Sequence, residues 1–178
     1  FQHMSTAGSV ELIRRARAAG QLVSAEATPH HFTLTDAACA SYDPVFKVNP
    51  PLRTDDDVAA VKVGLGDGSL DCIATDHAPH APETKELPFD QAPPGMLGLE
   101  TALALALTEL TLPIGEVLAL MSGRPAAIAG LGDHGQAIEA GVMANLCVID
   151  PSATWVVDPS KLASRSRNTP FTGRTLRG

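Results

Sequence analysis

Apolar positions along the chain fall into two patterns, helical spacing and short continuous runs, and together these predict an α/β protein. The helical pattern is typified by Val10, Ile13 and Ala16, which lie on one face of a helix that ends at Gly20. The predicted helices span residues 10–19, 55–65, 100–110, 114–121 and 126–131. The apolar runs predict buried strands over 22–27 and 72–74. A strand, a helix and a second strand joined by short links form a right-handed parallel unit.

The two ends of the chain depart from this pattern. Phe1–Met4 is typical of the end of a buried strand, so we expect the chain to be the carboxy-terminal portion of something longer. The tail carries short β-branched segments over 144–150 and 154–157, which predict strands of a small separate sheet. Residues 81–98 are rich in proline and charge and predict a long loop.

Composition narrows the functional classes. The 178 residues include 13 Lys and Arg against 20 Asp and Glu, and no basic stripe with interleaved aromatic residues occurs, which argues against nucleic-acid binding. No segment approaches the roughly 18 apolar residues needed to cross a bilayer. The three cysteines, Cys39, Cys72 and Cys147, are far apart, and the last two lie in apolar runs. We expect them to be reduced, which favours a cytoplasmic protein.

The segment Asp71–His80 carries the strongest chemical signal. Its apolar run ends at Ala74 and delivers Asp76 and His77 to the carboxyl end of a strand, where parallel α/β folds place their chemistry. A carboxylate with two imidazoles within four residues can ligate a divalent metal, move a proton and hold a polar substrate. The alternative is a turn in which Asp76 caps backbone amides and both histidines lie on the surface.

Other polar residues follow the neighbouring strands and should converge on the same rim. A metal held by His3 and Asp76 would join two strand ends, whereas His3 taken alone is more typical of a buried, satisfied histidine. His30 and His31 point in opposite directions if their segment is extended, and we expect neither to be a ligand. Asn49 precedes two prolines, so it either contacts a substrate from a stiff segment or caps its own turn. No Gly-x-Ser-x-Gly elbow is present, which argues against a serine hydrolase.

Five motifs in order give the chain a family resemblance. It resembles bacterial class I dihydroorotase, of the amidohydrolase superfamily, over essentially its whole length. The motifs are His3-Met4-Ser5-Thr6, Thr28-Pro29-His30-His31, Lys47-Val48-Asn49-Pro50-Pro51-Leu52-Arg53, Ala74-Thr75-Asp76-His77-Ala78-Pro79-His80 and Asn168-Thr169-Pro170-Phe171. The resemblance implies the later part of a (β/α)8 TIM-type barrel over residues 1–136, and a segment over 137–178 that contributes to a small β-sandwich.

The resemblance also assigns roles to residues. It makes His3 a zinc ligand, Asp76 both a zinc ligand and the general acid/base, and His80 and Asn49 contacts to the substrate. One or two zinc ions are implied, with the bridging ligand left open. A substrate contact from the later loop falls on Pro94 and Gly95, of which only Gly95 has an amide hydrogen to donate.

The implied reaction is the reversible cyclisation of N-carbamoyl-L-aspartate to L-dihydroorotate. The family's His-x-His metal pair belongs to earlier strands that this sequence does not contain, so we expect the chain to be inactive without the remaining amino-terminal half of the barrel. A homodimer and a complex with aspartate transcarbamoylase are both open. The alternatives are another cyclic amidohydrolase, such as a hydantoinase or allantoinase, and a non-catalytic dihydroorotase-like subunit that scaffolds aspartate transcarbamoylase.

Overall fold

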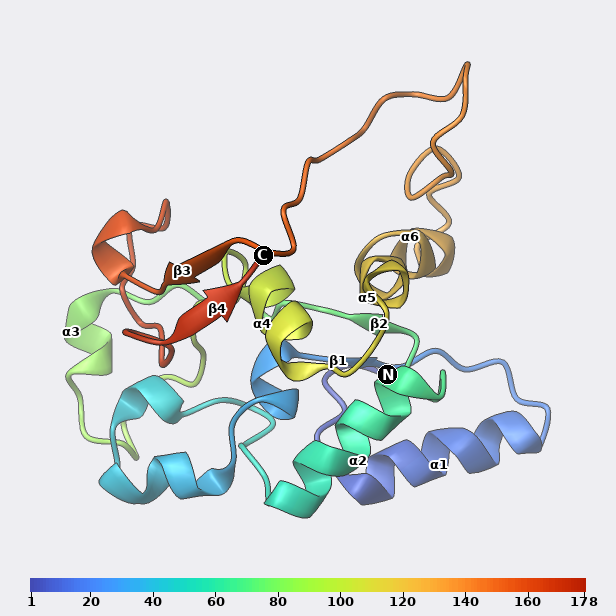
Figure 1. The fold of residues 1–178 in the computed structure, drawn as a ribbon. Helices are drawn as coiled ribbons and strands as arrows, with labels where there is room; N and C mark the ends of the chain where they lie inside the picture. Colours follow the sequence, from blue (N-terminus) through green and yellow to red (C-terminus); the bar gives the residue numbers. More distant parts are fainter.

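A short parallel sheet lies at the centre of the computed structural model, which describes residues 1–178 (Figure 1). Strand β1 (Glu26–Ala27) pairs with β2 (Cys72–Ile73), with Glu26 opposite Cys72. Phe1–Met4 runs beside β1, because the amide of Glu26 donates to Phe1 O at 3.1 Å and that of Met4 donates to Glu26 O at 2.8 Å. The α/β prediction is confirmed, although β1 is shorter than predicted and Leu22 is fully exposed.

Helices α1 (Ala7–Ala18) and α2 (Asp55–Gly66) lie side by side on one face of this sheet (Figure 1). Threonine N-caps begin both helices: the Thr6 hydroxyl accepts from the amide of Ser9, and Thr54 accepts from Asp57. Asp57 also accepts from the amide of Ala7 at 2.8 Å, and this hydrogen bond lowers the pKa of its carboxyl. The acidic start of α2 therefore joins the two helices at their amino-terminal ends.

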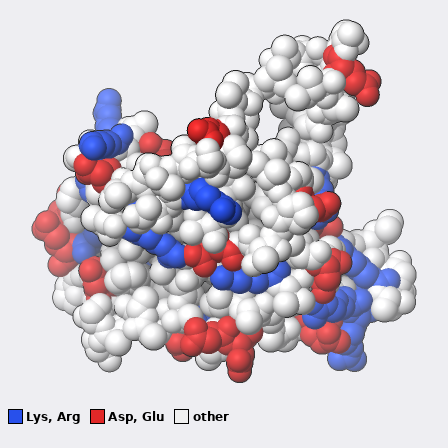
Figure 2. All heavy atoms as spheres, in the orientation of Figure 1, with Lys and Arg blue, Asp and Glu red and all other residues white.

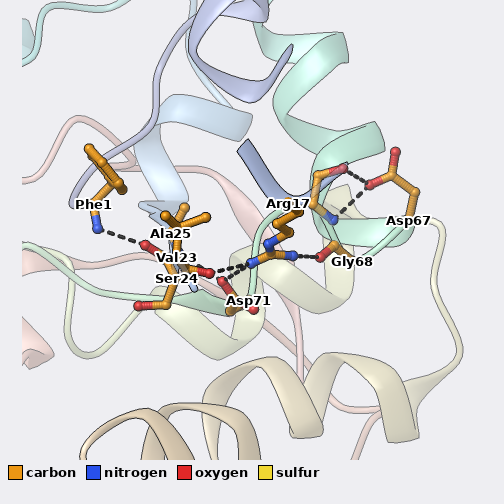
Figure 3. Close-up of polar contacts among 9 residues, drawn as sticks. Phe1, Arg17, Val23, Ser24, Ala25, Asp67, Gly68 and Asp71 are labelled. Carbon is orange, nitrogen blue, oxygen red and sulfur yellow. Dashed lines mark hydrogen bonds and ion pairs between the residues drawn. The ribbon is translucent and has the colours of Figure 1, made fainter. Parts of the chain in front are cut away.

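An ion pair fixes the amino-terminal ends of the strands (Figure 3). Arg17 from α1 pairs with Asp71, immediately before β2, and also donates to the carbonyls of Gly68 and Val23. Asp71 in turn accepts from the amide of Ala25 at 2.7 Å. One guanidinium and one carboxylate thus connect α1, the end of α2 and the entries to both strands.

The remaining helices cover the other face of the sheet and supply much of the core. Helices α4 (Ala102–Glu109), α5 (Ile114–Met121) and α6 (Gly123–Ile128) follow one another, and α5 and α6 contact β2. Leu105 and Leu120 are fully buried there. None of the helices combines the length and apolar character required to cross a bilayer.

The segments predicted as loops contain short helices. Residues 81–98 include the four-residue helix α3 (Pro82–Lys85), which begins with a proline at its first position, as helices often do. Four 3-10 helices span Pro29–Phe32, Asp36–Ser41, Pro44–Phe46 and Pro159–Lys161.

A second sheet forms in the tail. The strand predicted over 154–157 is confirmed as β3 (Thr154–Val156), which pairs antiparallel with β4 (Thr175–Arg177), a strand that the sequence pattern did not predict. This sheet packs on α4, where Arg177 donates to the carbonyl of Leu107 at 2.6 Å.

Residues 131–153 project from the molecule as an arch between α6 and β3 (Figure 1). The predicted strand over 144–150 is wrong, since none forms there and both Leu146 and Val148 are exposed. A strand needs a hydrogen-bonding partner, and β3 and β4 pair with each other instead. Cys147 is likewise exposed rather than packed in an apolar environment. Figure 2 shows acidic and basic side chains interspersed over the face it displays, whereas the arch sequence has three acidic residues and no Lys or Arg.

Candidate functional site

Three side chains from different segments meet beyond the carboxyl ends of the parallel strands. His3 Nε2 lies 3.7 Å from Asp76 Oδ1, and His30 Nε2 lies 3.9 Å from Asp76 Oδ2. His3 and Asp76 both have positive φ angles, 56° and 45°, which non-glycine residues rarely adopt. Such conformations cost free energy and concentrate at functional sites. The structure thus brings together the two residues that the sequence proposed as a metal pair, and adds His30.

The electrostatics of His30 favour a neutral ring. Its side chain is 2% exposed, and burial, with smaller effects from His31 and His3, holds the pKa of His30 well below its usual value. Its Nε2 atom is buried and has no hydrogen-bond partner. A buried, unpartnered nitrogen facing a carboxylate is an arrangement that a bound cation would satisfy.

Glu26 in β1 supports His3 from the side opposite Asp76. Its Oε1 lies 3.0 Å from His3 Nδ1, although the alignment of the two groups falls short of a hydrogen bond. Histidines that bind metals commonly place a carboxylate at the second ring nitrogen, which orients the ring. Here Glu26 occupies that place, and His3 Nε2 faces Asp76.

These side chains fit part of a zinc site. Imidazole nitrogen and carboxylate oxygen are both donors that zinc accepts, and zinc sites contain three or four protein ligands. His3, His30 and Asp76 are the right kinds of donor, but they do not form a group that could hold a metal ion by itself. The chemistry of the donors is therefore suitable, and their arrangement in this chain is not a complete site.

His31 points away from this group and has a structural role. Its Nδ1 lies 2.7 Å from Thr28 Oγ1 and its Nε2 lies 2.9 Å from the carbonyl of Pro50. Burial lowers the pKa of His31 to about 4. Residues 29–32 form a 3-10 helix rather than an extended segment, so the alternation expected of a strand did not predict which ring faces Asp76. Pro29 at the first helical position was the available signal.

Asn49 and Pro94 share a second feature, a pocket of about 370 Å³ that Phe89 and Cys39 also line. Asn49 is exposed, and its side chain makes no hydrogen bond within the chain. The alternative in which Asn49 caps its own turn is therefore not supported.

His80 contacts the loop that carries Pro94 and Gly95. Its Nε2 lies 3.0 Å from the carbonyl of Pro94. Gly95 has a φ of 128°, and a Cβ added there would lie 2.6 Å from Ala78 Cβ and 2.8 Å from His80 Nε2. The amide of Gly95 already donates to Lys47 O at 2.8 Å, so the amide expected to face a substrate has a partner within the chain. No ion pair or hydrogen bond joins this group to His3 or His30.

Comparison with known proteins identifies what the chain is similar to. The chain is 52% identical over 180 residues to the dihydroorotase of Pelotomaculum thermopropionicum and 49% identical over 178 residues to that of Mycobacterium tuberculosis. These alignments cover 99% and 98% of the chain. The chain is therefore similar to part of a dihydroorotase. It spans about 42% of the length of the curated relatives, and no family model matches it.

Solved structures of hydantoinases and a dihydropyrimidinase share the α/β fold of this chain over part of their length. L-hydantoinase from Arthrobacter aurescens is 30% identical and superposes with a TM-score of 0.90, covering 99% of the chain and 41% of the hydantoinase. A dihydropyrimidinase from Brevibacillus agri superposes with a TM-score of 0.86 at 22% identity, which supports the fold alone. Within this chain, the segments that end at His3 and Asp76 lie on either side of β1, and their carboxyl ends lie at the same edge of the sheet.

Proposed function

We propose that this chain is part of a zinc-dependent dihydroorotase, which interconverts N-carbamoyl-L-aspartate and L-dihydroorotate. The convergence of His3, His30 and Asp76, with the buried Nε2 of His30 unpartnered, is the observation that carries the proposal. Identity of about 50% to proteins named dihydroorotase supports this substrate over other cyclic amides.

In this proposal His3, His30 and Asp76 hold zinc together with ligands from the rest of the barrel. Bound zinc would supply a Lewis acid and lower the pKa of a coordinated water. Glu26 keeps the His3 ring oriented, so that Nε2 faces the metal position.

Asp76 is the proton-transfer group of the proposed reaction. During ring opening its carboxylate takes a proton from the attacking water and passes it to the leaving ring nitrogen, and during ring closure it takes a proton from that nitrogen and returns it to the departing water. Asn49 and His80 contact the ring and its carboxylate, and the Pro94–Gly95 loop closes the site beside His80. We assign the loop a shaping role, because the amide of Gly95 is bonded to Lys47 O.

Residues 1–136 form the last strands and helices of the barrel in this proposal, and residues 137–178 contribute to a small β-sandwich. Residues 144–150 of the arch are apolar and exposed, which supports the proposal that a strand from outside this chain pairs with them. The remaining amino-terminal half of the barrel is the required partner, while a homodimer and aspartate transcarbamoylase are further candidates.

The test is turnover of dihydroorotate by the zinc-loaded full-length protein that carries this chain. We expect Asp76→Asn to lower kcat by about a hundredfold or more, the usual contribution of a positioned acid or base. Asp133→Asn, which removes a carboxylate from the exposed arch, should leave turnover unchanged. Unchanged turnover in Asp76→Asn would refute the assigned role.

The rival activity is that of a hydantoinase, which the likeness to the L-hydantoinase from Arthrobacter aurescens suggests. A substrate panel of dihydroorotate, hydantoin and allantoin separates the two. Preferred turnover of hydantoin would replace the proposed substrate, and absence of turnover on all three would favour the scaffolding subunit.

A further inference from the structure

Asn168, in the tail, is a buried polar residue whose side-chain amide is fully hydrogen-bonded near the candidate site. It is 7% exposed and belongs to a motif that none of the assigned roles explains. Its Oδ1 accepts from the amide of His80 at 3.2 Å, and its Nδ2 donates to the carbonyl of Ala78 at 2.9 Å and to that of Gly95 at 3.3 Å. Its own carbonyl accepts from the amide of Leu97 at 3.0 Å.

These contacts join two segments that have no other regular pairing at this point. A single parallel bridge connects His77 to Met96, and the amide of Ala78 donates to Met96 O at 3.0 Å. Beyond Ala78 no backbone hydrogen bond joins the two segments. Beyond that point the side chain of Asn168 supplies the hydrogen bonds between the two segments, since its amide presents a donor and an acceptor as a backbone peptide does.

The two segments approach each other so closely that their spacing has little tolerance. An added Cβ at Gly95 would overlap Ala78 Cβ and crowd His80 Nε2. The separation of His80 from Gly95 is therefore limited by this close contact, and it is held by the contact of His80 Nε2 with Pro94 O and by the bonds of Asn168.

We propose that Asn168 is a positioning residue, which holds the His80 segment and the Gly95 loop at the separation that substrate binding requires. The proposal rests on the proposed function, because His80 and the Gly95 loop matter as contacts to dihydroorotate. The tail, in which the sequence showed no catalytic residue, is then a structural part of the binding site.

Two substitutions of Asn168 remove different sets of its hydrogen bonds. Asn168→Asp keeps the shape and the acceptor for His80 but replaces both donors with an oxygen that faces the carbonyls of Ala78 and Gly95. Asn168→Ala removes all three side-chain contacts. Asn145→Asp in the exposed arch is the matched control, since it adds the same charge far from the contacts of Asn168.

The kinetic experiment measures KM and kcat for dihydroorotate in the full-length protein. We expect both Asn168 variants to raise KM about tenfold or more with a smaller change in kcat, because the groups that bind substrate are displaced while Asp76 is not. Zinc content should equal that of the wild type, and Asn145→Asp should behave as the wild type. A residue that only stabilises the fold would lower the unfolding temperature and leave KM unchanged.

Hydrogen exchange tests whether Asn168 holds the His80 segment in place, and this test does not depend on activity. We expect the amide of His80 to exchange slowly in the wild type and at least about tenfold faster in Asn168→Ala, since its acceptor is gone. Unchanged KM in a folded Asn168→Asp variant, or unchanged His80 exchange in Asn168→Ala, would overturn the proposal. If the wild type fails to turn over dihydroorotate, the proposed function falls while the exchange comparison still decides whether Asn168 holds the segment.

Discussion

Gly95→Ala is the substitution for which the structure gives the sharpest expectation. Gly95 has a φ of 128°, beyond the left-handed region that other residues occasionally enter, and an added Cβ would lie 2.6 Å from Ala78 Cβ. Backbone strain at such a position costs about 1–3 kcal/mol. Relieving the overlap costs about 1–3 kcal/mol more. We therefore expect the free energy of unfolding to fall by about 2–6 kcal/mol.

Gly20→Ala separates the two contributions. Gly20 has a φ of 77° with no atom within 4 Å of an added Cβ, so this variant carries strain without overlap. It should cost only about 1–2 kcal/mol. Denaturant unfolding of the full-length protein measures both values. If the two variants agree within about 0.5 kcal/mol, the close contact between the Gly95 loop and the His80 segment does not resist substitution, and the reasoning is refuted.

Three further predictions concern the framework. Burial, with a contribution from the charge of Lys47, lowers the pKa of Lys85 to about 8. The rate of acylation of Lys85 should therefore rise with a midpoint near pH 8, and the exposed Lys161 serves as the control for access of the reagent. A midpoint near the ordinary value of 10.5 would contradict this. The unfolded chain binds the proton of the Lys85 ammonium more tightly than the folded chain does. The destabilising effect of Lys85 on the fold should therefore be largest below about pH 8 and disappear as the pH rises to about 10.5. Thr54→Ala removes the N-cap of α2 and should cost about 1 kcal/mol by denaturant unfolding. Leu105→Ala empties a fully buried core position and should cost about 2–5 kcal/mol in the same assay, whereas no loss would place Leu105 outside the core.

Local signals in the sequence predicted the helices well. Helix α2 begins at the predicted residue, 55, whereas α1 begins at Ala7, three residues before the apolar spacing predicted, because the Thr6 cap extends it. Strands were harder, because a strand exists only where a second strand presents hydrogen-bonding groups. Residues 144–150 have the composition of a strand and no partner, and β4 follows the turn-forming Gly173 in a tail with weak periodicity.

The candidate site shows the same division between local and long-range information. Asp76 and His3 were predictable because each follows a strand-like run. His30 was not, since a 3-10 helix decides which of two adjacent rings faces Asp76, and the strand rule of alternating sides does not apply there. Asn168 could not be found as a contact to the site by spacing at all, because it lies 88 residues from His80 in sequence.

The two ends of the short sheet differ in how well their polar groups are hydrogen-bonded. At the amino-terminal ends, Arg17 and Asp71 make a dense set of bonds to backbone groups (Figure 3). At the carboxyl ends, His3 and Asp76 adopt strained conformations and His30 keeps a buried nitrogen without a partner. Strain and unsatisfied groups persist only where the surrounding structure over-determines them. The conformations of His3 and Asp76 are therefore held by the surrounding fold, and the bonds of Arg17 and Asp71 at the other end of the same short sheet are part of that fold.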